Sequence, residues 1–410
     1  MAAPIKVELV KGPDGYSLRR EGKPYFVNGG GGEGSAKLLS QMGGNSQRTW
    51  GAENLEKRLD EAHALGQTVT VGIWLGHPRH GFNYNDPAQV AEQYEMAKAA
   101  ILKYKDHPAV LAWGIGNEME GEGNDAAIWS AINNIASMAK RLDPNHPTMT
   151  VIADMGDKGQ KVKNIHALCP DIDIIGINAY GGGPTVAERY KAFGGTKPYI
   201  VTEFGPIGSW SIGRNDFGAP TELTSAAKAE QYRKTYVGAV SGPAAKGVSL
   251  GSYAFIWGHK FEATATWFGM LLPDNTRLAA ADVMSEMWTG KPPANLVPVI
   301  QSLAPAGADR GKPGETITIS LKASDPEGDP LKVEWVLLGE TTQYVTGGDH
   351  MNTPAELAGL VLTPSLTGCT VKLPSEPGVY RLYAYVRDNH GGGATASLPI
   401  LSGPIPKPAK

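Results

Sequence analysis

Short runs with strand character alternate with amphipathic segments over the first 290 residues of the chain. Most of these runs are apolar at successive positions, which predicts strands buried on both faces, as in a parallel sheet. The segments between them carry apolar residues three to four positions apart, and several open with a capping residue, which predicts helices. Among them are a helix that Asp86-Pro87 caps and that runs through Tyr104, and the next one at Asp125–Leu142. We expect strands at Pro24–Asn28, Gly44–Thr49, Gln67–Trp74, Ala109–Glu118, Thr148–Asp154, Ile172–Tyr180, Lys197–Glu203 and Val248–Trp257.

Eight strand–helix pairs in this length predict an α/β fold, the (β/α)8 TIM barrel, which typically takes about 250 residues. A doubly wound sheet is the alternative, but it usually shows a glycine-rich nucleotide fingerprint at the start of a helix. The run Gly29–Gly32 lacks the Lys-Ser/Thr ending of a phosphate loop. We expect these glycines to let the backbone pass close to a neighbouring group or take positive φ.

The pattern changes after a proline-rich stretch that reads as a stiff linker. Strands of alternating polarity at 316–321, 331–336, 369–373 and 378–386, separated by turns, predict a β-sandwich. We expect a barrel with a short N-terminal β segment at residues 1–290, the linker at 291–298 and an immunoglobulin-like β-sandwich domain at 299–410. The carboxylates of Asp325, Glu327 and Asp329 have the chemistry to hold calcium, but a solvated turn is the preferred interpretation.

Two of the apolar strands end in a glutamate, Glu118 and Glu203. A carboxylate in such a place costs free energy unless the site needs it. The carboxyl ends of barrel strands form the active face of a TIM barrel, so residues there indicate catalysis. Two carboxylates on that face suggest the acid and the nucleophile of a sugar-cleaving enzyme, which stand about 5–5.5 Å apart when the anomeric configuration is retained.

Composition narrows the classes of partner. The 410 residues carry a net charge of −3, which argues against a nucleic-acid partner, since such a partner requires a basic face. No apolar run approaches the roughly 20 residues of a membrane span. Cys169 and Cys369 have no zinc or redox spacing. The C-terminal domain looks extracellular, so we expect a secreted, periplasmic or cell-surface protein whose signal peptide has been removed.

The motifs Gly116-Asn117-Glu118 and Thr202-Glu203-Phe204-Gly205, each after an apolar strand, resemble those of the clan A glycoside hydrolases. The glutamates are 203 − 118 = 85 positions apart, close to the separation that this clan shows between strands four and seven. The likeness covers about residues 20–290. It implies a retaining O-glycosyl hydrolase with Glu118 as acid/base and Glu203 as nucleophile.

The same resemblance assigns neighbours to the two glutamates. It implies that Asn117 binds the sugar 2-hydroxyl and that Arg48 orients Glu203. Tyr180 is expected to donate a hydrogen bond to Glu203, and Trp257 to form the floor of the −1 subsite. The alternative is that the two glutamates are salt-bridged structural residues. Glu120 and Glu122 follow Glu118 closely and are interpreted as loop residues, whereas Asp154 either lines the cleft or has a structural role.

Further residues at the ends of predicted strands are candidates for binding the substrate, because aromatic faces stack on sugar rings and polar groups bind hydroxyls. They are Trp50, Trp74, Trp210, His259, Glu262 and Trp267. A metal site built from His77, His80, His259 and Glu262 is the alternative, but these residues follow strands three and eight, which are not adjacent around a barrel. We expect no catalytic metal and no cofactor.

The expected substrate is a β-linked oligo- or polysaccharide. A barrel followed by an immunoglobulin-like module resembles the β-1,3-glucanases of glycoside hydrolase family 158, which favours an endo-β-1,3-glucanase. Family 2 enzymes usually carry β-domains before the barrel, and only about 20 residues precede it here, which disfavours them. Cellulase, mannanase and β-galactosidase types, transglycosylation, and a carbohydrate-binding protein on a degenerate barrel stay open as alternatives.

Overall fold

The computed structural model describes residues 3–344 and 348–405. Met1 and Ala2 lie outside the described residues. The chain divides into two compact units, one holding the residues up to Phe204 with Lys234–Phe255, and the other Gly205–Arg233 with the residues from Ile256 onward. The domain boundaries near residues 290 and 299 stay a prediction. No helix among the described residues is long and apolar enough to cross a membrane.

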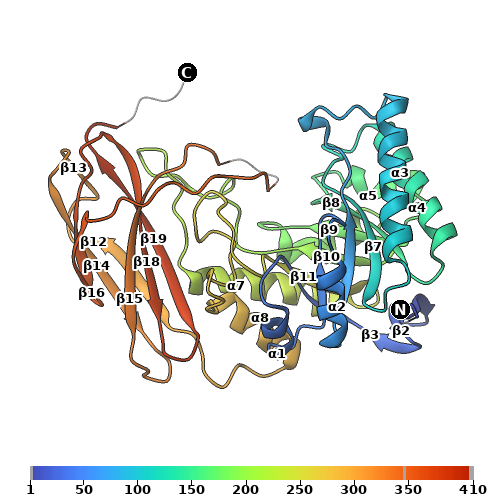
Figure 1. Cartoon of the computed structure of the whole chain (residues 1–410), viewed down its shortest axis with the longest axis horizontal. Coiled ribbons are helices and arrows are strands. Elements are labelled where there is room, and N and C mark those ends of the chain that lie inside the picture. The colour runs from blue at the N-terminus through green and yellow to red at the C-terminus, as the bar shows by residue number, and fades with distance from the viewer. Residues whose placement is uncertain (1–2, 345–347, 406–410) are drawn as a thin grey trace. The chain divides into compact units, whose positions relative to one another are not determined.

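Eight parallel strands in the first unit close into a barrel, which confirms the predicted TIM barrel (Figure 1). Around the barrel the order is β10-β11-β4-β5-β6-β7-β8-β9, so each strand pairs with its neighbours in the sequence and the last pairs with the first. The strands are β4 (Val27–Gly31), β5 (Ser46–Arg48), β6 (Thr68–Ile73), β7 (Val110–Asn117), β8 (Thr148–Ala153), β9 (Ile174–Asn178), β10 (Tyr199–Glu203) and β11 (Ser249–Phe255).

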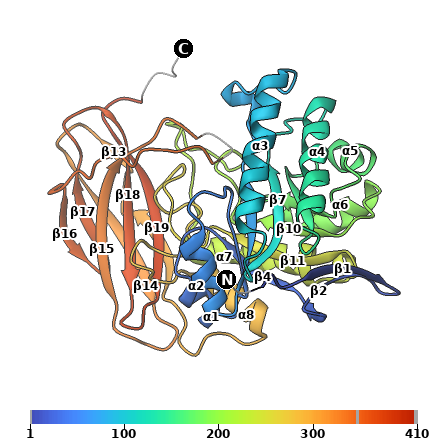
Figure 2. The same ribbon diagram turned by 45° about the vertical axis from the view of Figure 1, so that its right-hand side comes forward.

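A helix follows each barrel strand, and Figure 2 shows α3, α4 and α5 side by side. Asp86 and Asp125 begin α3 and α4 as predicted, because each carboxylate accepts a backbone N–H two residues on. The helices are α1 (Ala36–Gln41), α2 (Glu56–Ala64), α3 (Pro87–Tyr104), α4 (Ala126–Leu142), α5 (Gln160–Leu168), α6 (Val186–Ala192), α7 (Ser225–Thr235) and α8 (Ala279–Thr289). Short 3-10 turns lie at Pro78–His80, Gly183–Thr185 and Pro243–Ala245, and a π-helical segment at Tyr236–Ser241 continues α7.

The first barrel strand lies later in the sequence than the predicted Pro24–Asn28. It is β4, and it contains three residues of the glycine run, Gly29–Gly31. The Tyr253 ring, on the neighbouring strand, fills the position that a Cβ at Gly29 would take. Its hydroxyl reaches Ser46 at 2.9 Å and Thr70 at 2.6 Å inside the barrel. Glycine is therefore needed here because an aromatic ring packs against the strand backbone.

A small antiparallel sheet precedes the barrel and consists of β1 (Val7–Gly12), β2 (Gly15–Arg20) and β3 (Lys23–Tyr25). Its Val7 and Leu18 join a buried apolar cluster with Leu111, Met149 and other residues near the starts of the barrel strands. The sheet therefore covers the amino-terminal end of the barrel, opposite the end where Glu118 and Glu203 lie.

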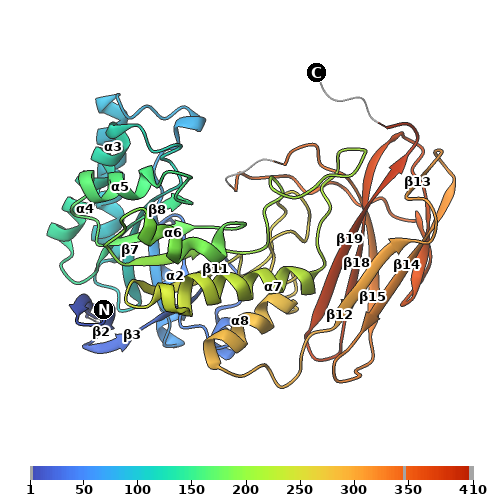
Figure 3. The same ribbon diagram turned by 180° about the vertical axis from the view of Figure 1, so that it is seen from behind.

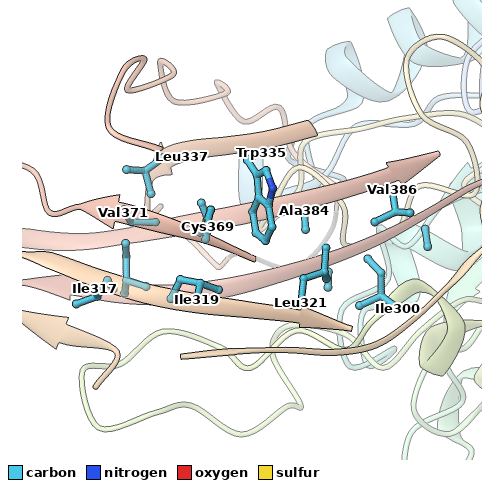
Figure 4. Close-up of a cluster of buried hydrophobic side chains, with 14 of the residues drawn as sticks. Ile300, Ile317, Ile319, Leu321, Trp335, Leu337, Cys369, Val371, Ala384 and Val386 are labelled. Atoms are coloured by element: carbon cyan, nitrogen blue, oxygen red, sulfur yellow. The ribbon is translucent and has the colours of Figure 1, made fainter. Parts of the chain in front are cut away.

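Two four-stranded sheets make up most of the second unit (Figure 3). Their orders are β12-β14-β17-β16 and β13-β19-β18-β15. Alternate residues of both sheets, such as Ile319, Trp335 and Val371, meet in one apolar core (Figure 4). The immunoglobulin-like relationship stays a prediction. The strands are β12 (Val299–Pro305), β13 (Arg310–Gly311), β14 (Thr316–Ser324), β15 (Lys332–Gly339), β16 (Val361–Ser365), β17 (Gly368–Lys372), β18 (Gly378–Arg387) and β19 (Gly393–Ser402).

The loops that follow β10 and β11 pack on the outer face of the second of these sheets. After β11, Phe261 and Ala265 form an apolar cluster with Leu338 and Tyr383, and the Tyr383 hydroxyl accepts the backbone N–H of Ala265 at 3.3 Å. After β10, Phe217 and Ala219 form another cluster with Leu401. These contacts all lie within the second unit. That face of the sheet is therefore covered by loops of the same chain.

A buried ionic network connects the same sheet to these loops. Arg381 on β18 is 1% exposed and donates two hydrogen bonds to the Glu340 carboxylate, at 2.6 and 2.8 Å. It also donates to Ser397, at 3.0 Å, which in turn donates to Glu222 at 2.6 Å. Glu222 pairs with Lys228 on α7. Two carboxylates and two cations thus compensate one another out of contact with solvent.

Replacing Arg381 is expected to destabilise the protein strongly. The Arg381→Ala change removes one partner of a buried network, and the uncompensated carboxylates cost about 3–5 kcal/mol of unfolding free energy. Arg387→Ala, on the same strand, is the matched control: its partner Glu334 is exposed, so the loss is expected to stay below about 1 kcal/mol. Urea unfolding of both variants measures this. Equal losses for the two would contradict a special role of the buried network.

Candidate active site

Both predicted glutamates lie at the carboxyl end of the barrel. Glu203 is the last residue of β10, and Glu118 directly follows β7. The pairing register shifts beside each of them, between Gly114 and Asn117 and between Val201 and Glu203. Such irregularities re-aim side chains at strand ends. Glu118 also has a left-handed backbone, with φ of 55°, a conformation that costs about 1–3 kcal/mol and is typical of functional sites.

Three donors hold the Glu203 carboxylate. Arg48 Nη1 and Trp50 Nε1 donate to Oε1 at 2.9 and 2.8 Å, and the Tyr180 hydroxyl donates to Oε2 at 2.8 Å. The side chains of Arg48 and Glu203 are only 3% and 8% exposed. The rings of Trp50 and Tyr180 both meet Phe255 edge-on, at centroid distances of 5.8 and 5.9 Å. The carboxylate is therefore fixed in orientation, and its negative charge is stabilised by charge-assisted hydrogen bonds.

The Asn178 side-chain amide holds the Glu118 carboxyl. Asn178 Nδ2 donates to Glu118 Oε1 at 2.7 Å. Thr202 Oγ1 donates to Asn178 Oδ1 at 2.7 Å, which fixes the orientation of the side-chain amide. Burial raises the pKa of Glu118 to about 7, the Glu203 charge adds to the rise, and the Asn178 hydrogen bond opposes it. Glu118 is thus suited to carry a proton near neutral pH.

Four hydrogen bonds join the two carboxyls. Asn178 Nδ2 donates both to Glu118 Oε1, at 2.7 Å, and to Asn117 Oδ1, at 3.2 Å. Arg48 donates both to the same Asn117 oxygen, at 2.7 Å, and to Glu203, at 2.9 Å. The oxygen of Asn117 thus accepts twice. Its amide nitrogen has no acceptor among residues 3–344 and 348–405 and remains available to a bound hydroxyl.

Among the aromatic residues of the first unit that were predicted to bind substrate, Trp74 is the most exposed. It follows β6, is 37% exposed, and lies 4.8 Å from the ring of His77 between centroids. The His77 and His80 rings lie 5.6 Å apart between centroids and are tilted by 46°. Within the described ranges, the one group of three potential metal ligands close together is Asp325, Glu327 and Asp329, in the second unit. Asp325 Oδ1 already accepts hydrogen bonds from the backbone N–H groups of Glu327 and Asp329 in the same turn.

The other predicted binding residues lie in the second unit, and their roles toward substrate stay predictions. Trp210 is 40% exposed beside Phe268, and His259 is exposed. Trp257 and Trp267 are each 1% exposed. Glu262 is buried and ion-paired with Lys260 at 2.8 Å.

Sequence reasoning missed two polar groups beside the glutamates and left a third undecided. Asn178, the end of β9, was not singled out, although it stands two residues before Tyr180 at a strand end. Glu120 was interpreted as an ordinary loop residue, yet it is buried and paired with Lys161 at 2.9 Å. Asp154, whose role was left open, forms a bidentate ion pair with Arg189.

Residues 58–240 match the model of the glycosyl hydrolases family 2 TIM barrel domain. A β-glucuronidase of Paenibacillus borealis is 27% identical over 190 residues, which is 41% of this chain and 30% of that protein. A probable mannan endo-1,4-β-mannosidase F of Aspergillus flavus is 28% identical over 173 residues, 35% of this chain and 36% of that protein. The chain thus spans about a third of the length of these curated relatives.

Solved structures show the same likeness of fold. The Ruminococcus gnavus β-glucuronidase matches with a TM-score of 0.54 and 17% identity, over 69% of this chain and 53% of that one. A Bacteroides uniformis β-glucuronidase matches with a TM-score of 0.51 and 16% identity, over 98% of this chain and 48% of that one.

These comparisons correct one expectation and leave another without support. The short segment before the barrel had disfavoured family 2, but the barrel sequence itself matches that family, and what precedes a barrel does not determine its sequence. The resemblance to family 158 finds no support in these matches. Residues 58–240 correspond to the TIM barrel domain of glycosyl hydrolases family 2, and the chain is related to the glycoside hydrolases.

Proposed function

We propose that the protein is a retaining β-glycoside hydrolase of the family 2 type, with Glu203 as the nucleophile and Glu118 as the acid/base. The observation that carries this proposal is the unequal environment of two linked carboxyls. Glu203 accepts hydrogen bonds from three donors, one of them cationic, whereas burial and the neighbouring charge raise the pKa of Glu118 to about 7. Two titratable groups with such different surroundings are typical of an acid and its partner.

The two steps of the reaction use this difference. In the first, a Glu203 oxygen bonds to the anomeric carbon while Glu118 gives its proton to the departing glycosidic oxygen. The ester that forms no longer carries the Glu203 charge, so the pKa of Glu118 falls. Glu118 then takes a proton from water, whose oxygen attacks the anomeric carbon and releases Glu203. The free amide N–H of Asn117 is placed to donate to a hydroxyl of the bound sugar.

The proposed substrate is a β-linked glycoside. The names of the relatives point to β-glucuronides and β-mannans, and the exposed Trp74 face offers a stacking surface for a further sugar ring. The finer prediction of an endo-β-1,3-glucanase has no support from the relatives. It is tested by including β-1,3-glucan among the substrates. A binding protein on a degenerate barrel is disfavoured because both glutamates keep their hydrogen-bonding partners.

The proposal predicts that the first product keeps the β configuration. A panel of aryl β-glycosides including the glucuronide, with β-mannan and β-1,3-glucan, identifies the substrate. Proton NMR during the first minutes of turnover then gives the anomer of the released sugar before it mutarotates. Two displacements at one carbon restore the original configuration. An initial α product would contradict the covalent role of Glu203.

A further inference from the structure

A buried ion pair lies directly behind the proposed acid. Glu120, two residues after Glu118, has a side chain only 1% exposed, and Lys161 on α5 is 10% exposed. Their charged atoms are 2.9 Å apart. A buried pair of this kind costs desolvation and is weak evidence for added stability, so its place beside Glu118 calls for another explanation.

The pair extends the sheet beyond the point where β7 ends. The backbone N–H of Glu118 donates to Val151 on β8 at 3.0 Å. Two residues along β8, the backbone N–H of Ala153 donates to the Glu120 carboxylate at 2.9 Å. Lys161 completes the arrangement by donating to the Ala153 carbonyl at 2.6 Å. The Glu120 carboxylate thus takes the place of a strand carbonyl.

Glu118 is held between these two attachments. Its φ of 55° is left-handed, which a glutamate adopts only when its surroundings impose it. The hydrogen bond to Val151 fixes the residue on one side, and the Glu120–Lys161 pair fixes the turn on the other. Without the second attachment, the turn could relax and move the Glu118 carboxyl.

We propose that Glu120 and Lys161 act together as positioning residues, which hold the Glu118 backbone and balance the charge next to its carboxyl. The inference deepens the proposed function and rests on it for the catalytic meaning of Glu118. Two observations support the proposal that the pair balances the charge next to Glu118. The Glu120 charge contributes to the raised pKa of Glu118, and the second oxygen of Glu120 is buried with no hydrogen-bond partner in the described part of the chain.

Other charged groups near Glu118 are paired as well. Glu203 from β10 raises its pKa and Arg48 from β5 lowers it, and the two also pair with each other. Asp154 at the end of β8 is paired with Arg189 from α6. The Glu120–Lys161 pair can therefore be altered without touching Arg48, Trp50 or Tyr180, which hold Glu203.

The test is a carbon-13 NMR titration of the Glu118 carboxyl, with the signal assigned by its loss in Glu118→Gln. Glu120→Gln removes a negative charge and leaves Lys161 uncompensated, so the midpoint is expected to fall by about one pH unit, the usual effect of one unit charge within roughly 10 Å. In Lys161→Met, burial favours the neutral form of Glu120, so the midpoint is expected to stay or rise. The double variant Glu120→Gln/Lys161→Met restores neutrality and is expected to titrate like the wild type.

Glu122→Gln, at an exposed position two residues further on, controls for a general change of charge. An unchanged midpoint in Glu120→Gln, or equal falls in both single variants, would overturn the inference. If Glu120→Gln fails to fold, the double variant and Lys161→Met decide it, since a fall in either contradicts charge balance. The titration needs no turnover, so an inactive protein with the expected shifts would refute the proposed function and leave the charge balance standing.

Discussion

Glu203→Gln is expected to reduce kcat/KM for the best aryl glycoside by at least about 10⁴-fold. An amide cannot form the glycosyl ester, and removal of a covalent nucleophile produces losses on this scale or larger. Glutamine has the shape of glutamate, so its carbonyl oxygen can still accept from Arg48 and Trp50, and its amide can meet the Tyr180 hydroxyl. Steady-state kinetics on the purified variant measure the loss.

The substrate is expected to bind to Glu203→Gln with an affinity near that of the wild type, as measured by calorimetry, because the change leaves the shape of the site intact. Glu122→Gln, which removes an exposed carboxylate near Glu118, is the matched control and should keep its activity. If Glu203→Gln retained a tenth of the wild-type rate, the nucleophile would be another residue.

The barrel was predictable from the sequence because its strands are buried on both faces and therefore read as apolar runs. β7 and β10 end within one residue of the predicted ends. Local chemistry also fixed the starts of α3 and α4, since Asp86 and Asp125 cap them. Signals of this kind depend on neighbours in the sequence, which is why the sequence alone reveals them.

The features that the sequence did not reveal depend on distant partners. The glycine run predicted a close approach of the backbone to another group, but only the structure identifies that group at Gly29 as the Tyr253 ring. The contact of Arg381 with Glu222 and Glu340 joins three segments, and no periodicity pairs a particular arginine with a particular glutamate. The packing of the loops after β10 and β11 on a sheet of the second unit was missed for the same reason.

The site shows the same division. The positions of Glu118 and Glu203 at strand ends followed from their apolar strands, and the contacts of Arg48 and Tyr180 with Glu203 were suggested by the family resemblance. Glu120 gave no signal, because a glutamate in a glycine-rich turn reads as exposed. The structure shows that Glu120 is buried and paired with Lys161 on α5, which is far from it in the sequence.

Glu118→Gly is expected to separate substrates by their leaving groups. Glycine suits the left-handed backbone at this position. Loss of a general acid costs about 10²–10⁴-fold, so alkyl and sugar leaving groups, which need a proton, should show this loss in kcat/KM. A dinitrophenyl group leaves without a proton, so its kcat/KM should stay close to that of the wild type. Parallel kinetics with both classes of substrate measure the difference.

The pH profile provides the second half of this prediction. Glu118 must carry a proton in the first step, and its raised pKa of about 7 means that wild-type kcat/KM should be steady below pH 7 and fall above it. Glu118→Gly should lack this alkaline limb. Azide, which needs no base to attack the glycosyl ester, should speed turnover of the dinitrophenyl substrate and yield a glycosyl azide. An unchanged alkaline limb in the variant, or equal losses for both leaving groups, would show that another residue is the acid.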